Sequence, residues 1–114
     1  MATTNVLPNA NERSTYVITA AFTDETGAPV TPNNGLVWSL MDPLGTVMNS
    51  RSAVSVTPAT TIQIVLHGAD LAVGGLGQSR KVTIQGTYNS SLGSNLELKS
   101  EATFSITPLV GVAD

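Results

Sequence analysis

The sequence predicts an all-β fold, namely an antiparallel β-sandwich of about seven strands with Greek-key connections. Three observations support this prediction. Apolar and polar residues alternate along five stretches of the chain, turn-forming residues separate the stretches at short intervals, and no stretch has convincing helical periodicity. A period of two places alternate side chains on opposite faces of a strand, so one face of each stretch can join a core.

Seven strands are expected, and turn-forming residues account for the breaks between them. In chain order the strands cover residues 14–23, 36–41, 46–49, 53–56, 60–66, 80–89 and 96–107. Pro29 and Pro32 follow the first strand and disfavour helix at the residues before them, which keeps this segment extended. Residues 42–45 (DPLG) have proline and glycine where a type I turn needs them, so residues 46–49 are expected to return along the strand before the turn.

The expected core lies between two sheets about 10 Å apart. Its large members are Phe22, Trp38, Ile64, Ile84 and Phe104. Residues 67–71 break the alternation and are expected to hold one helical turn, and residues 74–77 (GGLG) are expected to form a flexible loop. Residues 1–13 and 108–114 are expected to be tails on either side of a domain that spans residues 14–107.

Length and composition indicate one domain and exclude several function classes. The chain has 114 residues and no cysteine, so the core must hold the fold without disulfides. Charged residues make up only 11%, well below the usual quarter, which suits a chain that sits among other proteins but is also common in secreted β-domains. The net charge is −3 and the five basic residues are scattered, so no basic stripe is present to follow a nucleic acid.

Membrane association is not expected either. The sequence has no Lys/Arg-rich amphipathic stretch and no apolar run that approaches the ~20 residues of a spanning helix. Its N-terminal residues are polar and lack the charged and apolar regions of a secretory signal, which predicts synthesis in the cytoplasm.

No group of residues has the spacing of a catalytic, cofactor or metal site, so none is predicted. His67 is the only histidine and precedes Asp70 by three residues, but no nucleophile-elbow pattern accompanies them, and we interpret it as a loop residue. One histidine without cysteine does not make a zinc site. Asp24, Glu25 and Asp42 lack the spacing of a calcium loop, and the two aspartates stand where Asx turns need them.

Four other features have plain structural interpretations. Residues 74–77 lack the Lys-Ser/Thr of a phosphate loop, and residues 89–91 (NSS) match the glycosylation triplet by chance in a chain without a secretory signal. Trp38 is interpreted as a core anchor, with a sugar-binding tryptophan as the alternative. Glu97 and Glu101 lie on the polar parity of the last strand and are interpreted as part of a solvated face.

Several segments resemble immunoglobulin-like (Ig-like) proteins. Residues 22–30 (FTDETGAPV) followed by residues 36–40 (LVWSL) resemble bacterial Ig-like domains, in which a D-x-x-G-x-P-V turn joins two strands. The wider pattern, over about residues 11 to 110, is similar to small Ig-like structural proteins of tailed bacteriophages. The segments that carry this wider resemblance are residues 11–16 (NERSTY), 66–71 (LHGADL), 87–93 (TYNSSLG) and 98–104 (LKSEATF).

The resemblance implies an Ig-like sandwich and a non-enzymatic component of the virion, such as a capsid decoration (cement) protein or a head–tail or tail accessory subunit. It carries over no catalytic residue. The expected partners are other virion proteins, contacted in multiple copies, and the N-terminal tail is expected to lie on a neighbouring subunit. The alternative is a carbohydrate-binding or adhesion module of Ig-like fold, which predicts an exposed aromatic ring near a loop tip, with Tyr88 as the candidate.

Overall fold

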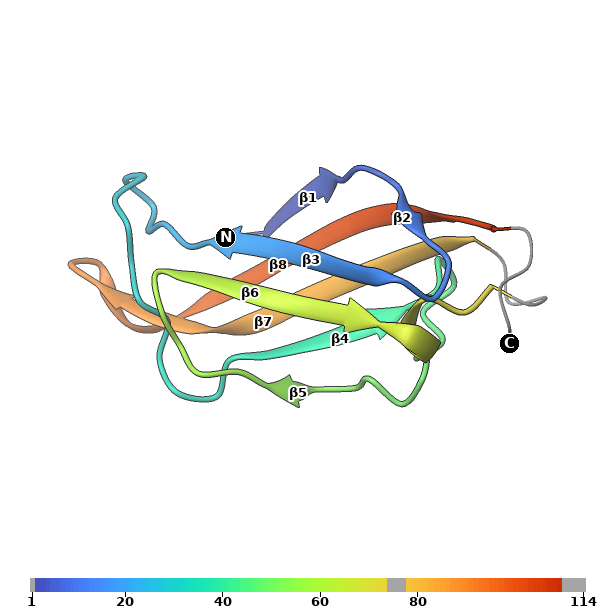
Figure 1. Ribbon diagram of the computed structural model, residues 1–114. Coiled ribbons are helices and arrows are strands. Elements are labelled where there is room, and N and C mark those ends of the chain that lie inside the picture. Colours follow the sequence, from blue (N-terminus) through green and yellow to red (C-terminus); the bar gives the residue numbers. More distant parts are fainter. Residues whose placement is uncertain (1, 74–77, 110–114) are drawn as a thin grey trace.

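The computed structural model describes residues 2–73 and 78–109 and shows an all-β chain (Figure 1). The described part contains one 3₁₀ turn and no α-helix. In chain order its elements are β1 (Ala2–Val6), β2 (Ala10–Asn11), β3 (Thr15–Ala21), β4 (Val37–Met41), β5 (Val54–Ser55), β6 (Thr61–His67), η1 (Gly68–Leu71), β7 (Ser79–Ser90) and β8 (Gly93–Thr107). The loop expected at residues 74–77 lies outside the described residues.

The strands form two sheets. Six strands build a mixed sheet in the order β1-β8-β7-β4-β5, in which β2 also pairs with β8. The other two strands, β3 and β6, form an antiparallel pair that lies across the larger sheet (Figure 1). The hairpin of β7 and β8 forms the middle of the larger sheet and supplies its longest strands.

The prediction of a purely antiparallel fold with a separate N-terminal tail is wrong at one edge. Both β1 and β2 run parallel to β8, with Ala2 opposite Lys99. The Leu7 N–H continues this pairing by donating to the Thr103 carbonyl oxygen at 2.8 Å. Without this segment, the 15-residue β8 would be an edge strand with a row of unpaired backbone groups. Backbone pairing does not require apolar side chains, so the polar sequence gave no sign of it.

The expected strand at residues 46–49 is also absent. Only an isolated bridge between Met41 and Val47 forms there. Asn49 and Ser50 then have positive φ angles of 51° and 57°, which a strand cannot continue through. The expected strand at residues 53–56 shrinks to β5 for a similar reason, because Ala53 also has a positive φ angle.

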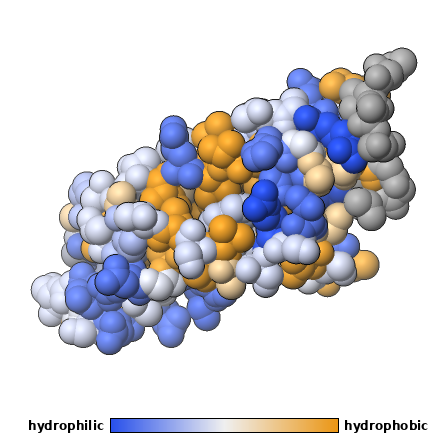
Figure 2. Space-filling model, turned by 60° about the horizontal axis from the view of Figure 1, so that its bottom comes forward, coloured by the Kyte–Doolittle hydropathy of each residue, from blue (hydrophilic) through white to orange (hydrophobic). Residues whose placement is uncertain are grey.

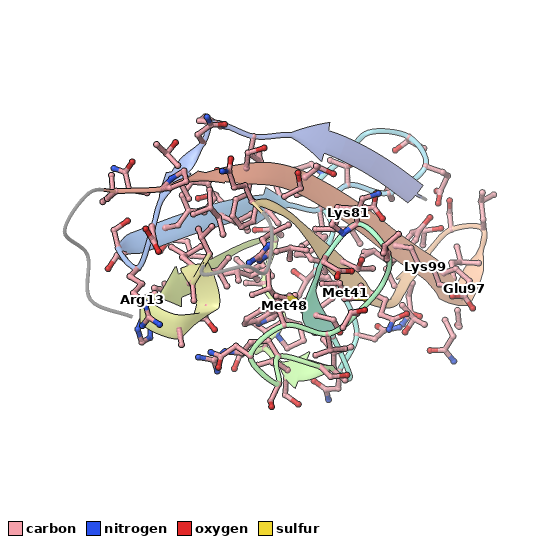
Figure 3. All side chains as sticks on the ribbon, turned by 90° about the vertical axis from the view of Figure 1, so that its right-hand side faces the viewer. Arg13, Met41, Met48, Lys81, Glu97 and Lys99 are labelled. Carbon is pink, nitrogen blue, oxygen red and sulfur yellow. The ribbon has the colours of Figure 1, made fainter. Side chains whose placement is uncertain are left out.

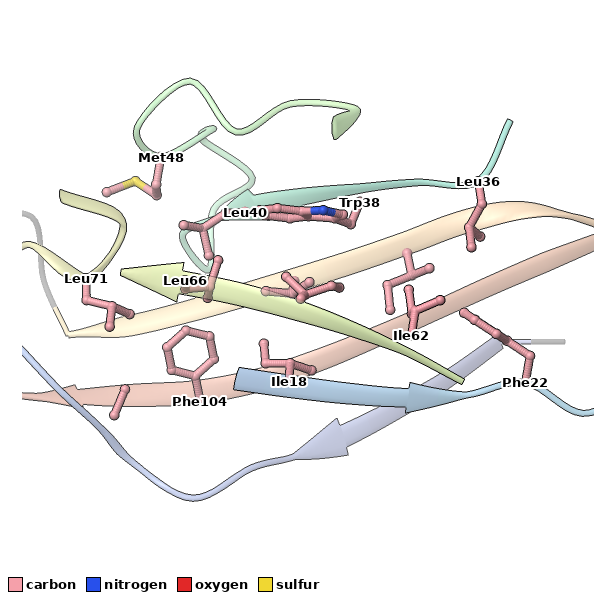
Figure 4. Close-up of a cluster of buried hydrophobic side chains, with 14 of the residues drawn as sticks. Ile18, Phe22, Leu36, Trp38, Leu40, Met48, Ile62, Leu66, Leu71 and Phe104 are labelled. Carbon is pink, nitrogen blue, oxygen red and sulfur yellow. The ribbon is translucent and has the colours of Figure 1, made fainter. Parts of the chain in front are cut away.

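The remaining strands and the core follow the prediction. The turn expected at residues 67–71 is η1, and the five expected core residues are all buried within one apolar cluster between the sheets (Figure 4). Beside them, the Tyr16 ring stacks on the Phe104 ring with 4.7 Å between centroids. Strand alternation therefore located the core, and the apolar faces of both sheets contribute to it.

Candidate interaction surface

The outer face of the β3–β6 pair carries no charged residue, counting histidine as neutral. Val17 and Val65 lie opposite each other at its centre and are 48% and 49% exposed. The full set of exposed side chains on this face is Thr15, Val17, Thr19, Ala21, Thr61, Gln63, Val65 and His67. Most of them are β-branched or small. Figure 2 shows apolar side chains at the surface in the middle of the molecule, interleaved with hydrophilic ones.

The outer face of the larger sheet is charged by contrast. Lys81 Nζ lies 3.2 Å from Glu101 Oε1, and Lys99 Nζ lies 3.7 Å from Glu97 Oε2. Figure 3 labels three of these side chains on the strands of this sheet. Each glutamate is paired with a lysine, and both lie on an outward parity of β8, which agrees with their interpretation as a solvated face.

One edge of β3 has no partner strand among the described residues, where β3 pairs only with β6. Phe22 N–H donates to the Thr60 carbonyl oxygen at 2.9 Å, just beyond one end of the ladder. In an antiparallel ladder, the backbone N–H and C=O groups of one residue point toward the partner strand, and those of the next residue point away from it. Even-numbered residues of β3 therefore bond to β6. The backbone N–H and C=O groups that face the open edge belong to Thr15, Val17, Thr19 and Ala21.

A cleft of about 340 Å³ opens beside this edge, between β3 and the inner side of β8. Small side chains at Ala20 and Ala102 leave the space. Four polar residues line it, namely Thr19, Thr23, Ser100 and Glu101, and the other lining residues are apolar: Leu7, Ile18, Ala20, Ala21, Phe22, Ile84, Tyr88, Leu98 and Ala102. A cavity of about 150 Å³ is enough to hold benzene, so this cleft has room for more than one apolar side chain.

Asp70 is the buried centre of a polar cluster. Its carboxylate accepts hydrogen bonds from Arg51 Nε at 2.8 Å, from Asn49 Nδ2 at 2.7 Å and from the His67 backbone N–H at 3.1 Å. Burial raises the pKa of Asp70, but these hydrogen bonds outweigh it and hold the pKa below its ordinary value. The bond from His67 comes from the backbone, and the cluster ties the segment around residues 49–51 to η1.

The aspartates considered for calcium serve turns. Asp24 Oδ1 accepts hydrogen bonds from the backbone N–H groups of Thr26 and Ala28 at 2.9 and 3.1 Å. Asp42 Oδ1 accepts from Leu44 and Thr46 in the same way, at 2.9 Å each. This confirms the Asx-turn interpretation. Within the described ranges, no group of three or more His, Asp or Glu side chains is placed to hold a metal ion.

The aromatic rings proposed for sugar stacking are buried. Tyr88 is 5% exposed and its hydroxyl donates to Glu25 Oε1 at 3.0 Å, and Trp38 is 7% exposed. The end of the β7–β8 hairpin is held by Asn33, whose Nδ2 donates to Asn89 Oδ1 at 3.1 Å. The exposed ring that a carbohydrate-binding module requires near a loop tip is therefore not provided by Tyr88.

Besides Asp70, two further charged residues are buried, and their burial was missed in the sequence. Arg80 is fully buried, and its guanidinium donates to the carbonyl oxygens of Ser79 and Ala72 at 2.8 Å each. Burial lowers the pKa of Arg80. Its position on the same parity as Val82 was a signal of this burial. Glu12 is 8% exposed and accepts a hydrogen bond from the backbone N–H of Leu109. The two residues are 97 positions apart in the sequence, so no local pattern could have predicted this contact.

Comparison with known proteins does not assign a family. No protein-family model, no curated protein and no solved structure matches the chain. None of the described residues forms a helix long and apolar enough to cross a membrane.

Proposed function

We propose that this chain is a non-enzymatic structural subunit that binds other protein subunits through the outer face and edges of the β3–β6 pair. In its narrower form, the proposal is a virion component of a tailed bacteriophage, either a capsid decoration protein or a head–tail accessory subunit. The observation that carries the proposal is the exposed β3–β6 surface without a single charge, next to an open strand edge.

Natural proteins rarely leave an uncharged sheet face beside an open strand edge exposed to solvent. Exposed edge strands are usually protected by lysine, proline, a bulge or a covering segment, because their unpaired backbone groups attract other strands. The sequence of β3, TYVITAA, contains no charge, no proline and no glycine. A strand of this kind invites aggregation in a free monomer, whereas in an assembly a neighbouring subunit covers it.

The proposal includes an Ig-like sandwich with Greek-key connections. Five strands support it by their distribution over the sheets. In chain order, the five strands β3, β4, β6, β7 and β8 correspond to strands B, C, E, F and G of an Ig domain. An Ig domain places B and E in one sheet and C, F and G in the other, and variable-type domains add a further strand beside C. The observed order β8-β7-β4-β5 opposite β3-β6 follows this distribution.

A pair of matched substitutions tests the proposal. Gln63→Glu adds a charge to the uncharged β3–β6 face, and Gln85→Glu makes the same change at an exposed position of β7, opposite Lys99. Both variants should fold, because both side chains are exposed. In a binding assay with purified virions or capsids, Gln63→Glu should weaken binding and Gln85→Glu should not.

Binding measurements decide the outcome. Equal binding by the two variants would place the contact surface elsewhere on the molecule. A wild-type chain that ignores every virion component would refute the virion proposal. Mass spectrometry of proteins that copurify with the chain from infected cells would then show whether any other assembly contains it.

A further inference from the structure

The open edge of β3 has a definite chemistry. Its outward N–H and C=O groups can bond a second strand, and the residues that carry them are uncharged and exposed. The cleft lies directly beside this edge, with Ile18 and Ala20 in its wall. Strand addition to a sheet edge takes affinity from the backbone bonds and specificity from side chains that enter adjoining pockets. The open edge therefore forms an acceptor for one added strand, and the cleft lies at its inner side.

A second copy of this chain is the occupant that fits this acceptor. The chain carries a net charge of −3, so two copies repel each other overall at long range. The β3 edge contains no charge, and it is a surface where two copies can meet without that repulsion. We propose that two copies pair their β3 strands antiparallel about a two-fold axis, which joins the two small sheets into one sheet of four strands.

The sequence of β3 is self-complementary in this arrangement. An axis at Ile18 pairs all seven residues of Thr15–Ala21 and brings the outward-facing backbone groups of Val17 opposite those of Thr19 in the second copy. On the inward face, Ala20 then lies opposite Tyr16 of the second copy. A small side chain thus meets a large one on each side of the axis, and on the axis itself Ile18 lies opposite Ile18 of the second copy as an apolar cross-strand pair.

The free edge of β6 is a poorer acceptor. The His67 N–H, which lies on the side away from β3, already donates to Asp70 Oδ2 at 3.1 Å. The side chains of Asp70 and its partners Asn49 and Arg51 lie beside this end of β6. On β3, by contrast, none of the described strands takes the outward groups. The pairing therefore uses β3 and leaves β6 at the outside of the joined sheet.

Sedimentation equilibrium of the full chain tests this inference, which deepens the proposed function and rests on its assignment of the β3–β6 surface. The wild-type chain should show concentration-dependent dimerisation. Thr19→Lys adds charge at the centre of the β3 edge, and Gln63→Lys makes the matched change at the same level of β6. Thr19→Lys should raise the dimer dissociation constant at least about tenfold, whereas Gln63→Lys should change it less than about threefold.

Cross-linking gives a second readout that does not depend on a loss of binding. The chain has no cysteine, so single variants Thr19→Cys and Gln63→Cys each carry one thiol. A short bis-maleimide should join two copies of Thr19→Cys and not two copies of Gln63→Cys. In the two-fold register, the two Thr19 positions are diagonal neighbours about 7–8 Å apart, within reach of such a reagent.

Each outcome has a definite meaning. Dimerisation with preferential cross-linking at Thr19 supports the inference. A chain that stays monomeric at millimolar concentration, or a dimer that cross-links at Gln63 or is equally weakened by both lysines, overturns it. A monomer that still binds capsids overturns only the pairing of two copies and leaves the proposed function standing. A chain that dimerises through β3 but does not bind capsids overturns the virion form of the proposed function and leaves the pairing of two copies standing.

Discussion

Replacing Asp70 by asparagine tests whether one buried carboxylate ties the segment around residues 49–51 to the start of η1. Asp70 is 1% exposed and accepts hydrogen bonds from Asn49, Arg51 and the His67 backbone. Asparagine keeps the shape of the aspartate side chain but replaces one carboxylate oxygen by an NH₂ group. That NH₂ group then faces one of the N–H donors that bonded to the oxygen. Hydrogen bonds to a charged group contribute about 1.5–3 kcal/mol each. The Arg51 side chain is 36% exposed, which weakens its share, so we expect a total loss of about 2 kcal/mol at pH 7.

Urea unfolding of the wild type and Asp70→Asn, at pH 7 and at lower pH, measures this effect. Burial raises the pKa of Asp70, but the hydrogen bonds lower it further, so the folded pKa lies below the unfolded value of about 3.9. Stability from this group is therefore present above the unfolded pKa and lost as the pH falls through the folded pKa. The difference in the free energy of unfolding between wild type and variant should be largest at pH 7 and should shrink as the pH falls below about 4.

A matched aspartate separates this role from a general effect of lost charge. Asp42 also accepts two backbone hydrogen bonds, but in a turn that is more exposed. Asp42→Asn should cost less stability than Asp70→Asn. An Asp70→Asn loss below about 0.5 kcal/mol, which is the range of surface substitutions, would refute the reasoning. A difference that stays constant between pH 7 and pH 3 would refute the contribution of the carboxylate charge.

Three further predictions concern the core, the N-terminus and a surface ion pair. Trp38→Ala should lower the free energy of unfolding by about 3–5 kcal/mol, because the ring is buried in the core, and a loss under about 1 kcal/mol in urea titration would contradict that position. Deleting residues 1–12 should lower the thermal midpoint, because it removes β1, β2 and the buried Ala10; an unchanged midpoint in calorimetry would mean that this segment adds nothing to the sheet. Lys81→Gln should change stability by less than about 1 kcal/mol, because its pair with Glu101 is partly exposed to water, and a larger loss by chemical denaturation would show a stronger coupling.

Local patterns in the sequence were sufficient for most strands. Alternation predicted β3, β4, β6, β7 and β8, because one-sided burial of a strand requires a period of two. It also predicted that Trp38 and Phe104 are core residues. Turn chemistry was equally local, since the Asx turns at Asp24 and Asp42 depend on residues two to four positions away. These features could be predicted because their causes lie within a few residues of one another.

The candidate surface was only partly visible in the sequence. The low charge content suggested a chain that sits among proteins, and the absence of charge from residues 14–23 and 60–68 could be read directly, apart from His67. That these two segments are neighbours, with an open edge at β3, follows from the pairing of residues 40 to 52 positions apart in the chain. The cleft depends on β7 and β8 as well, so no single segment could have indicated it.

The sequence by itself determined the all-β class and the inward parity of each main strand, because these depend on short-range periodicity and residue type. Only the tertiary structure decided that the polar N-terminal segment pairs in parallel with β8, that Asp70 is buried under Arg51, and that β3 keeps a free edge. The physical reason is that backbone groups are the same in every sequence. Which strands satisfy each other's hydrogen bonds depends on how the chain packs as a whole, and a strand edge remains open only where that packing leaves no partner.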